Sequence, residues 1–139
     1  MARLLAFVAL VLATASISAK EPAKPKNPDR FCENAKELAT ITDQLPDYKL
    51  SSDLASGATL NGKLKFDPRE LLRQAHGQSV CIAVVVSETG AVQDAAVYYP
   101  KTLALSQKER NQLLAQSYAP AQENGEPVKS IVVMKAWFQ

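Results

Sequence analysis

The feature that most constrains the fold is the β-forming stretch SVCIAVVVS at residues 79–87, in which residues 80–86 form an unbroken apolar run. β-Branched residues dominate the run, and they favour strands because their side chains fit a pleated surface. Successive side chains of a strand point to opposite faces, and here both faces are apolar. The run therefore predicts a central strand whose two faces are both covered by other parts of the chain.

The elements after this run are expected to complete a sheet. Glu88-Thr89-Gly90 predicts a tight turn into an antiparallel strand over residues 91–99. Ser106-Gln107-Lys108-Glu109 is a capping box, which predicts a helix over residues 106–117. Asn124-Gly125 predicts a turn before a last strand over residues 128–138. One face of this strand carries Val128, Val132, Met134, Ala136 and Phe138. The other carries Lys129, Ile131, Val133, Lys135 and Trp137.

The segment before the apolar run reads as helical and then irregular. Apolar residues recur every three to four positions over residues 31–45, which predicts one helix. The sequence LNGKL at residues 60–64 indicates a possible β-hairpin, because Asn-Gly supplies the positive φ angles of a tight turn. A short helix is expected over residues 68–76, with Asp67 as its cap.

The first residues have the three-part form of a secretory signal peptide. Arg3 gives a positive start, residues 4–12 are wholly apolar, and residues 13–19 are small and mildly polar. Cleavage fits after Ala15 or after Ala19. The alternative is an uncleaved anchor, although a spanning helix needs roughly 20 apolar residues. We therefore expect an exported protein that works outside the cytoplasm, with a membrane-anchored protein as the alternative.

Proline and lysine alternate in the next segment, residues 20–28, KEPAKPKNP, which predicts a short extended linker. At about 3.1 Å per residue this linker spans about 30 Å. The expected division is a signal peptide at 1–19, the linker at 20–28, a helix plus irregular segment at 29–66, and a domain at 67–139.

Two cysteines, Cys32 and Cys81, give an even count in a chain addressed to an oxidising compartment. We expect them to form a disulfide, which would stabilise the fold by roughly 4 kcal/mol. The alternative is two separate buried thiols.

Patterns typical of catalysis and metal binding are missing from the sequence. His76 is the single histidine, so no site can pair two imidazoles. The five glycines are scattered and form no phosphate-binding loop. The carboxylates Asp67 and Glu70 fit a solvated first helical turn. No cluster of basic residues is interleaved with aromatics, so nucleic acid is not expected. We expect a binding protein without catalytic residues, cofactor or metal.

Two stretches carry a family resemblance, VVVSETGAV at residues 84–92 and YAPAQENGEPV at residues 118–128. With these stretches, residues 68–138 resemble the C-terminal domain of TonB-family proteins. In that family an aromatic residue, then Pro-Ala, then Gly-x-Pro-Val joins the helix to the last strand. The residues that match the family motif are Gly90, Tyr118, Pro120, Ala121, Gly125, Pro127, Val128 and Phe138.

The resemblance implies an α+β fold, with a small antiparallel sheet of about three strands and one packed helix in the order β-β-α-β, preceded here by a helical segment. It also implies a module that binds an envelope protein, such as an outer-membrane receptor, by strand addition at the last strand. Together with the signal peptide, the resemblance implies a periplasmic protein, with an inner-membrane protein that faces the periplasm as the alternative. The edge residues expected to meet the partner are Lys129, Ile131, Val133, Lys135 and Trp137. Lysines on an edge strand also fit protection against aggregation, and both interpretations stay open.

Two other functions fit the sequence. One is a membrane-anchored TonB-like energy transducer for outer-membrane transport. The family's transducers, however, usually have a histidine in their anchor and a long spacer, whereas this chain has no histidine before His76. The other is an envelope structural or assembly factor that binds peptidoglycan or a subunit of a complex.

Overall fold

The computed structural model of the chain describes residues 30–137. The expected signal peptide, its cleavage sites, the linker and Phe138 lie outside the described residues. The described residues from Cys32 onward form one compact unit. In the described part of the chain, the helical segment expected at 29–66 and the domain expected at 67–139 therefore belong to the same compact unit.

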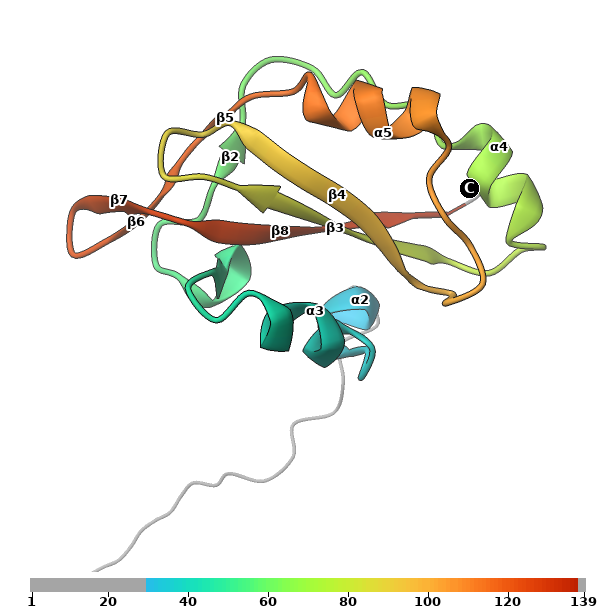
Figure 1. Ribbon diagram of the computed structural model, residues 1–139, viewed down its shortest axis with the longest axis horizontal. Helices are drawn as coiled ribbons and strands as arrows, with labels where there is room; N and C mark the ends of the chain where they lie inside the picture. Colours follow the sequence, from blue (N-terminus) through green and yellow to red (C-terminus); the bar gives the residue numbers. More distant parts are fainter. Residues whose placement is uncertain (1–29, 138–139) are drawn as a thin grey trace, which may run out of the picture. The chain divides into compact units, whose positions relative to one another are not determined.

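The main sheet is built around β3, whose residues are buried along its whole length, as the apolar run predicts. β3 pairs antiparallel with β4 on one side and with β8 on the other, and β8 also pairs in parallel with the short β1. The order across the sheet is β1-β8-β3-β4 (Figure 1). The bounds are β1 Lys49–Leu50, β3 Val80–Val86, β4 Val92–Tyr99 and β8 Ser130–Ala136.

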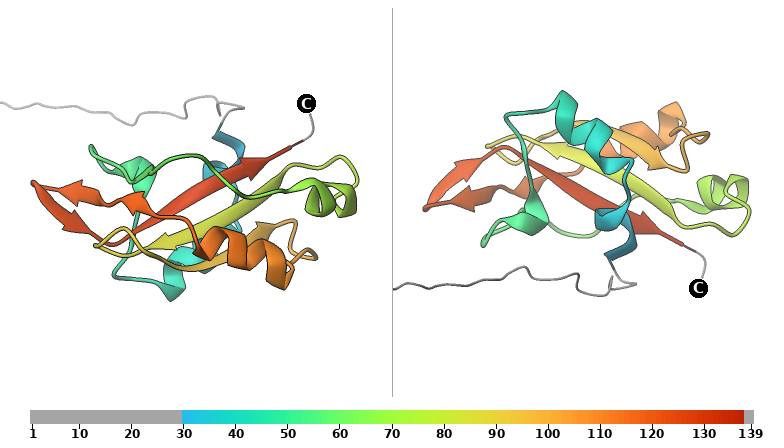
Figure 2. Two further views of the ribbon diagram at one scale, coloured as in Figure 1. Left: turned by 90° about the horizontal axis from the view of Figure 1, so that it is seen from above. Right: turned by 90° about the horizontal axis from the view of Figure 1, so that it is seen from below.

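Helices lie on both faces of this sheet, which explains why both faces of β3 are apolar (Figures 1 and 2). On one face, α4 (Arg69–Gln74) and α5 (Gln107–Leu114) contribute Leu71, Leu72 and Leu113 to a core with Ile82 and Val84. On the other face, α2 (Phe31–Asn34) and α3 (Leu38–Gln44) contribute to a second core. The buried members of that second core are Cys32, Leu38, Cys81, Ala83, Tyr98 and Ile131.

The mixed α+β class expected from the sequence is confirmed, but the sheet is larger than the expected three strands because β1 joins it. Two further sheets of two strands each lie in the described part of the chain. One is the small hairpin around the expected Asn124-Gly125 turn, where both residues have positive φ angles. The short elements are η3 Ser51–Asp53, β2 Thr59–Leu60, β5 Tyr118–Ala119, β6 Ala121–Glu123 and β7 Glu126–Val128.

The helix expected over residues 31–45 is divided into α2 and α3. Between them the chain makes tight turns, with Leu38 N–H donating to the Ala35 carbonyl at 3.1 Å. Cys32 and Leu38 are both almost completely buried in the same core. On one straight helix these two residues would point about 120° apart, since each residue turns the helix by about 100°. The break lets both side chains face the sheet.

The hairpin expected at residues 60–64 does not form. Leu60 pairs instead with Tyr118 in the β2–β5 ladder, and Asn61 N–H donates to the Ser117 carbonyl at 3.0 Å. Gly62 has the positive φ angle that the Asn-Gly pair suggested. A local turn signal was therefore present, but the strand that pairs with this segment comes from a distant part of the chain.

The capping box of α5 is confirmed, with Glu109 N–H donating to Ser106 Oγ at 3.1 Å and Ser106 N–H donating to the Glu109 carboxylate at 2.8 Å. The helix itself ends at Leu114, earlier than expected. The last strand is also shorter than expected, because β7 ends at Val128 and β8 begins at Ser130.

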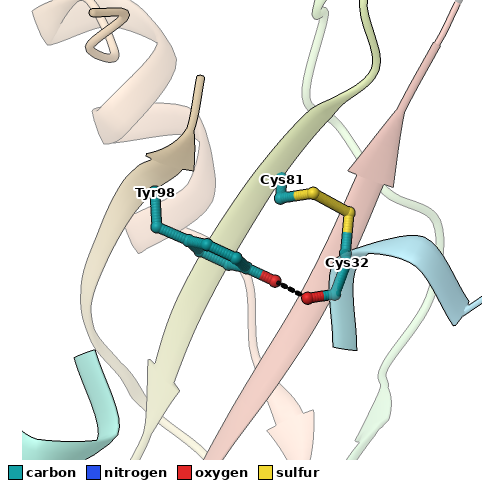
Figure 3. Close-up of a disulfide and its surroundings, with 3 residues drawn as sticks. All are labelled: Cys32, Cys81 and Tyr98. Carbon is teal, nitrogen blue, oxygen red and sulfur yellow. Dashed lines mark hydrogen bonds between the residues drawn. A yellow bond between two sulfur atoms is a disulfide. The ribbon is translucent and has the colours of Figure 1, made fainter. Parts of the chain in front are cut away.

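The expected disulfide joins Cys32 of α2 to Cys81 of β3, with their Cα atoms 5.5 Å apart (Figure 3). Both cysteines are buried, and the hydroxyl of Tyr98 on β4 donates to the Cys32 carbonyl at 2.7 Å. The bond and the hydrogen bond hold α2 against the sheet from two neighbouring strands.

Replacing both cysteines, Cys32→Ala with Cys81→Ala, is expected to lower the free energy of unfolding by about 4 kcal/mol, because the bond closes a loop with a sequence separation of 49. Urea denaturation followed by circular dichroism measures this loss. A double variant within about 1 kcal/mol of the wild type would contradict the stabilising role that we assign to the bond.

Candidate partner-binding edges

The sheet ends in two different edges. At one edge lies β4, and at the other lies the two-residue β1, which pairs only with Ser130 and Ile131 of β8. Residues 132–136 of β8 continue past the end of β1. An edge strand presents backbone N–H and C=O groups that another chain can pair with, so both edges are candidates for partner binding.

The hydrogen-bond directions along β8 follow from its contact with β1. Lys49 N–H donates to the Lys129 carbonyl at 3.4 Å, so the backbone groups of Lys129 point away from β3. Because these directions alternate along a strand, Ile131 and Val133 also point outward, whereas Val132 points toward β3. No backbone hydrogen bond joins Val133 to a described residue outside the β8 ladder. The outward edge at Val133 therefore lies beyond the reach of β1.

The side chains of the expected edge residues are placed differently from the sequence-based expectation. Ile131 is completely buried, and Val133 packs partly buried against the same core, because α2 and α3 cover this face of β8. Lys129 and Lys135 lie over the rings of Tyr48 and Trp137, with Nζ-to-centroid distances of 5.5 and 5.1 Å. The side chain of Ile131 is thus unavailable to a partner, and that of Trp137, 49% exposed, is available.

The β4 edge is capped by a charged side chain. Asp94 Oδ1 accepts from the N–H of Ala95 at 2.9 Å and from Arg110 of α5 at 2.7 Å. The β3–β4 register also shifts near each end, between Cys81 and Ile82 and between Val85 and Val86. Edge charges and bulges are devices that stop strands from pairing with other chains. Equivalent features are not found in the β3–β8 register of the described residues, which runs without a shift.

The family-motif residues gather where β5 meets the turn after β3. Gly90 has φ +90°, and Tyr118 N–H donates to its carbonyl at 2.9 Å. A Cβ atom at Gly90 would lie 1.9 Å from the Tyr118 carbonyl oxygen, so only glycine fits there. Burial raises the pKa of the Tyr118 hydroxyl. The other motif residues belong to the β6–β7 hairpin or lie next to it, and they direct the course of the backbone there. They are Pro120, Ala121, Gly125, Pro127 and Val128.

A shallow groove lies on the covered face between α3 and the strands β3 and β4. Its apolar lining is Ile41, Leu45, Tyr48, Ala83, Val85, Ala95 and Ala96, with Gln44, Gln93 and Asp94 beside them. The Tyr48 hydroxyl donates to the Gln93 side chain at 2.5 Å. Among residues 30–137 no group of three or more potential metal ligands is found, and no helix is long and apolar enough to cross a membrane.

A scan of the chain against protein-family models finds no match, and searches of curated proteins and of solved structures find no similar protein.

Truncation of Ile131 and of Trp137 should have opposite consequences for stability. Ile131→Ala is expected to cost about 2 to 5 kcal/mol because it leaves a cavity in a closed core. Trp137→Ala is expected to cost less than about 1 kcal/mol because the ring is half exposed. Thermal and urea melts of the two variants give the comparison, and a larger loss for Trp137→Ala would show that the faces of β8 are misassigned.

Removing the cap of the β4 edge, Asp94→Ala with Arg110→Ala, should increase self-association. The dimerisation constant is expected to rise by about fivefold, roughly 1 kcal/mol, as the edge becomes able to pair. Sedimentation equilibrium measures the constant. The matched control is Asp67→Ala with Arg69→Ala, which removes an exposed ion pair away from the sheet edges. Equal association of the two double variants would argue against a protective role for Asp94.

Proposed function

We propose that this protein is a non-enzymatic periplasmic module of TonB C-terminal type, which binds an extended segment of another envelope protein as an added strand on β8. An outer-membrane receptor is the partner class that the family resemblance suggests. The single observation that carries the proposal is the outward backbone edge at Val133, beyond the end of β1.

The contrast between the two edges supports the choice of β8. Asp94 and Arg110 cap the backbone of β4, and the β4 register shifts twice. β8 keeps one register with β3 from Ser130 to Ala136. A strand whose pairing is regular on one side presents evenly spaced groups on the other, which is the geometry that strand addition requires.

The order of the elements also supports the TonB-type assignment. β3, β4, α5 and β8 follow one another in the chain, and β3 lies between β4 and β8 in the sheet. The close contact of Gly90 with Tyr118 gives a physical reason for the two motif positions that the resemblance rests on. The covering helices α2 and α3 and the parallel strand β1 are additions to that arrangement.

β1 sets one end of the proposed docking edge. The chain turns into η3 directly after Leu50, and η3 still lies beside β8, so an added strand begins or ends beyond η3. Its other end lies near Trp137. The edge between these limits admits about four to five residues of partner, since a strand rises about 3.3 Å per residue. Such a short ladder favours reversible binding of a segment over permanent assembly.

Proline at Val133 should abolish partner binding while the fold persists, because it removes an N–H that points away from β3. The expected loss of affinity is about tenfold or more, with a change in stability of about 1 kcal/mol or less. Proline at Val132 is the matched control, since the N–H it removes belongs to the β3 ladder, and it should cost about 3 kcal/mol or more of stability. Val133→Ala controls for the loss of side-chain packing.

Binding is measured by photo-crosslinking from position 135 in intact cells, and stability by urea denaturation of the purified variants. Unchanged crosslinked products with Val133→Pro would refute strand addition at β8. Mass spectrometry of the mature N-terminus distinguishes the alternatives, because a chain that starts at Lys20 fits a periplasmic module and an intact Met1 in the membrane fraction fits an anchored transducer.

A further inference from the structure

A short piece of the chain, residues 49–53, lies along the first part of the β8 edge and is called the strap below. The strap consists of β1 and η3. Its two strand residues pair with Ser130 and Ile131 of β8, and η3 lies beside the same strand. The outward backbone groups of Ile131 face β1 while the strap is in place. The strap therefore limits an added strand to the part of β8 beyond η3.

The strap is attached to β8 by few and weak contacts. Its parallel ladder is only two residues long, and parallel pairing is slightly less stable per residue than antiparallel pairing. The Lys49 N–H donates to the Lys129 carbonyl at 3.4 Å, which is longer than the usual range of about 2.7 to 3.2 Å. Lys49 Nζ also pairs with Glu123 at 2.6 Å, but both side chains are partly exposed, and surface ion pairs contribute little.

The stretch of chain that contains the strap has no buried residue, whereas both of its ends are held in the cores. Residues 39–65, all of which the structure describes, are half-buried or exposed without exception. Leu38 and Phe66, which flank this stretch, are buried in the second and the first core. Segments with few buried contacts open locally at a lower free energy than the core does. The strap can therefore leave β8 and return while the sheet stays intact.

The outer side of the strap is incompletely packed. A hollow of about 440 Å³ lies against it. Tyr48 and Leu50 pack partly buried on the second core, and this contact returns the strap to β8 in the free protein. The strap is thus held in place without being enclosed. The hollow is lined by Thr42, Tyr48, Lys49, Leu50, Asp53, Leu54 and Glu123.

We propose that the strap is an autoinhibitory contact, which a partner strand displaces in order to pair with β8 as far back as Lys129. This inference rests on the proposed function, because it assigns the regulation of the same edge. Outward residues alternate along a strand, so displacement adds Lys129 and Ile131 to the edge that is already open at Val133. The apparent affinity for the partner is lowered in proportion to the fraction of molecules in which the edge is open. The stability of the strap therefore sets the strength of binding.

Native-state hydrogen exchange, followed by NMR, tests the opening of the strap without any partner. The Ile131 N–H faces the strap, whereas the Val132 N–H belongs to the β3 ladder. After correction for intrinsic rates, the Ile131 amide should exchange about tenfold or more faster than the Val132 amide, because only local opening is needed. Equal exchange of the two amides would show that the strap opens only with the sheet, and would overturn the inference.

Weakening the strap should expose the edge more often. Lys49→Ala with Glu123→Ala removes its ion pair and should raise the exchange rate of the Ile131 amide by about twofold to fivefold. The exchange rate of the Val132 amide should not change. The matched control is Glu70→Ala with Arg73→Ala, which removes an exposed ion pair of α4 and should leave both rates unchanged. An equal rise in both double variants would contradict a specific effect on the strap.

A disulfide that locks the strap tests whether the partner displaces it. Lys49→Cys with Ser130→Cys suits this purpose, because opposite Cα atoms of a ladder lie about 4.8 Å apart, within the range of a disulfide. Ser130 Oγ is buried without a hydrogen-bond partner among the described residues, so its replacement removes no polar contact there. Lys49→Ala with Ser130→Ala is the control that cannot form the bond. Peptide mapping by mass spectrometry verifies the new bond and the native one.

Photo-crosslinking in intact cells then compares two positions on β8. Crosslinking to the partner from position 129, next to the strap, should be lost in the locked variant and retained in the alanine control. Crosslinking from position 135, beyond the strap, should persist in both variants. This difference is expected because the locked strap blocks only the first part of the edge.

The outcomes separate the inference from the proposed function. Crosslinking from position 129 that is equal in the locked variant and the wild type, and is abolished by Val133→Pro, would overturn displacement and leave strand addition standing. Products that persist in the Val133→Pro variant would refute strand addition and with it the displacement by a partner. The exchange rates would still show in that case whether the strap opens by itself.

Discussion

Burial of β3 on both faces is the constraint on which the rest of the structure depends. A strand with valine, isoleucine, alanine and cysteine on both sides is stable in water only if each side is covered. α4 and α5 cover one side, and α2 and α3 cover the other. The helices on the second side are too short to persist alone, since isolated helices of fewer than about 12 to 15 residues are marginal. They depend on the sheet, and the sheet depends on them.

The covering of both sheet faces also explains why the edge of β8 presents mainly backbone groups. Ile131 and Val133 belong to the second core because they lie beside Cys81 and Ala83 on the same face. A partner at the proposed β8 edge would therefore meet main-chain groups first, and of the side chains there Trp137 is exposed while Lys129 and Lys135 are partly buried. Under the proposed function, recognition by such an edge would tolerate different partner sequences, provided that they are extended.

The sequence predicted those elements whose signals are local or complete within one strand. The apolar run predicted β3 and its two covers, Ser106 and Glu109 predicted the start of α5, and the cysteine count predicted the disulfide. It did not predict that Leu60 would pair with Tyr118, or that Lys49 would pair with Ser130. Pairing between distant segments produces no repeating pattern in the sequence of either segment. Within β8 the alternation separated the face of Val132, Met134 and Ala136 from the face of Ile131 and Val133 correctly. Nothing in that alternation showed that the face with Ile131 would be covered, since a lysine-rich strand face is equally compatible with solvent.

The position of β8 in the chain has a consequence for the order of folding. β8 is the last strand in sequence, yet it lies inside the sheet between β1 and β3, and Lys49 finds its partner only at Ser130. Cys32 likewise meets Cys81 only after the strand that carries it is in place. β3 and β4 can pair with each other early, but β1 cannot join the sheet until β8 lies between β1 and β3. Completion of the sheet therefore depends on contacts between residues far apart in the chain, a feature that slows folding.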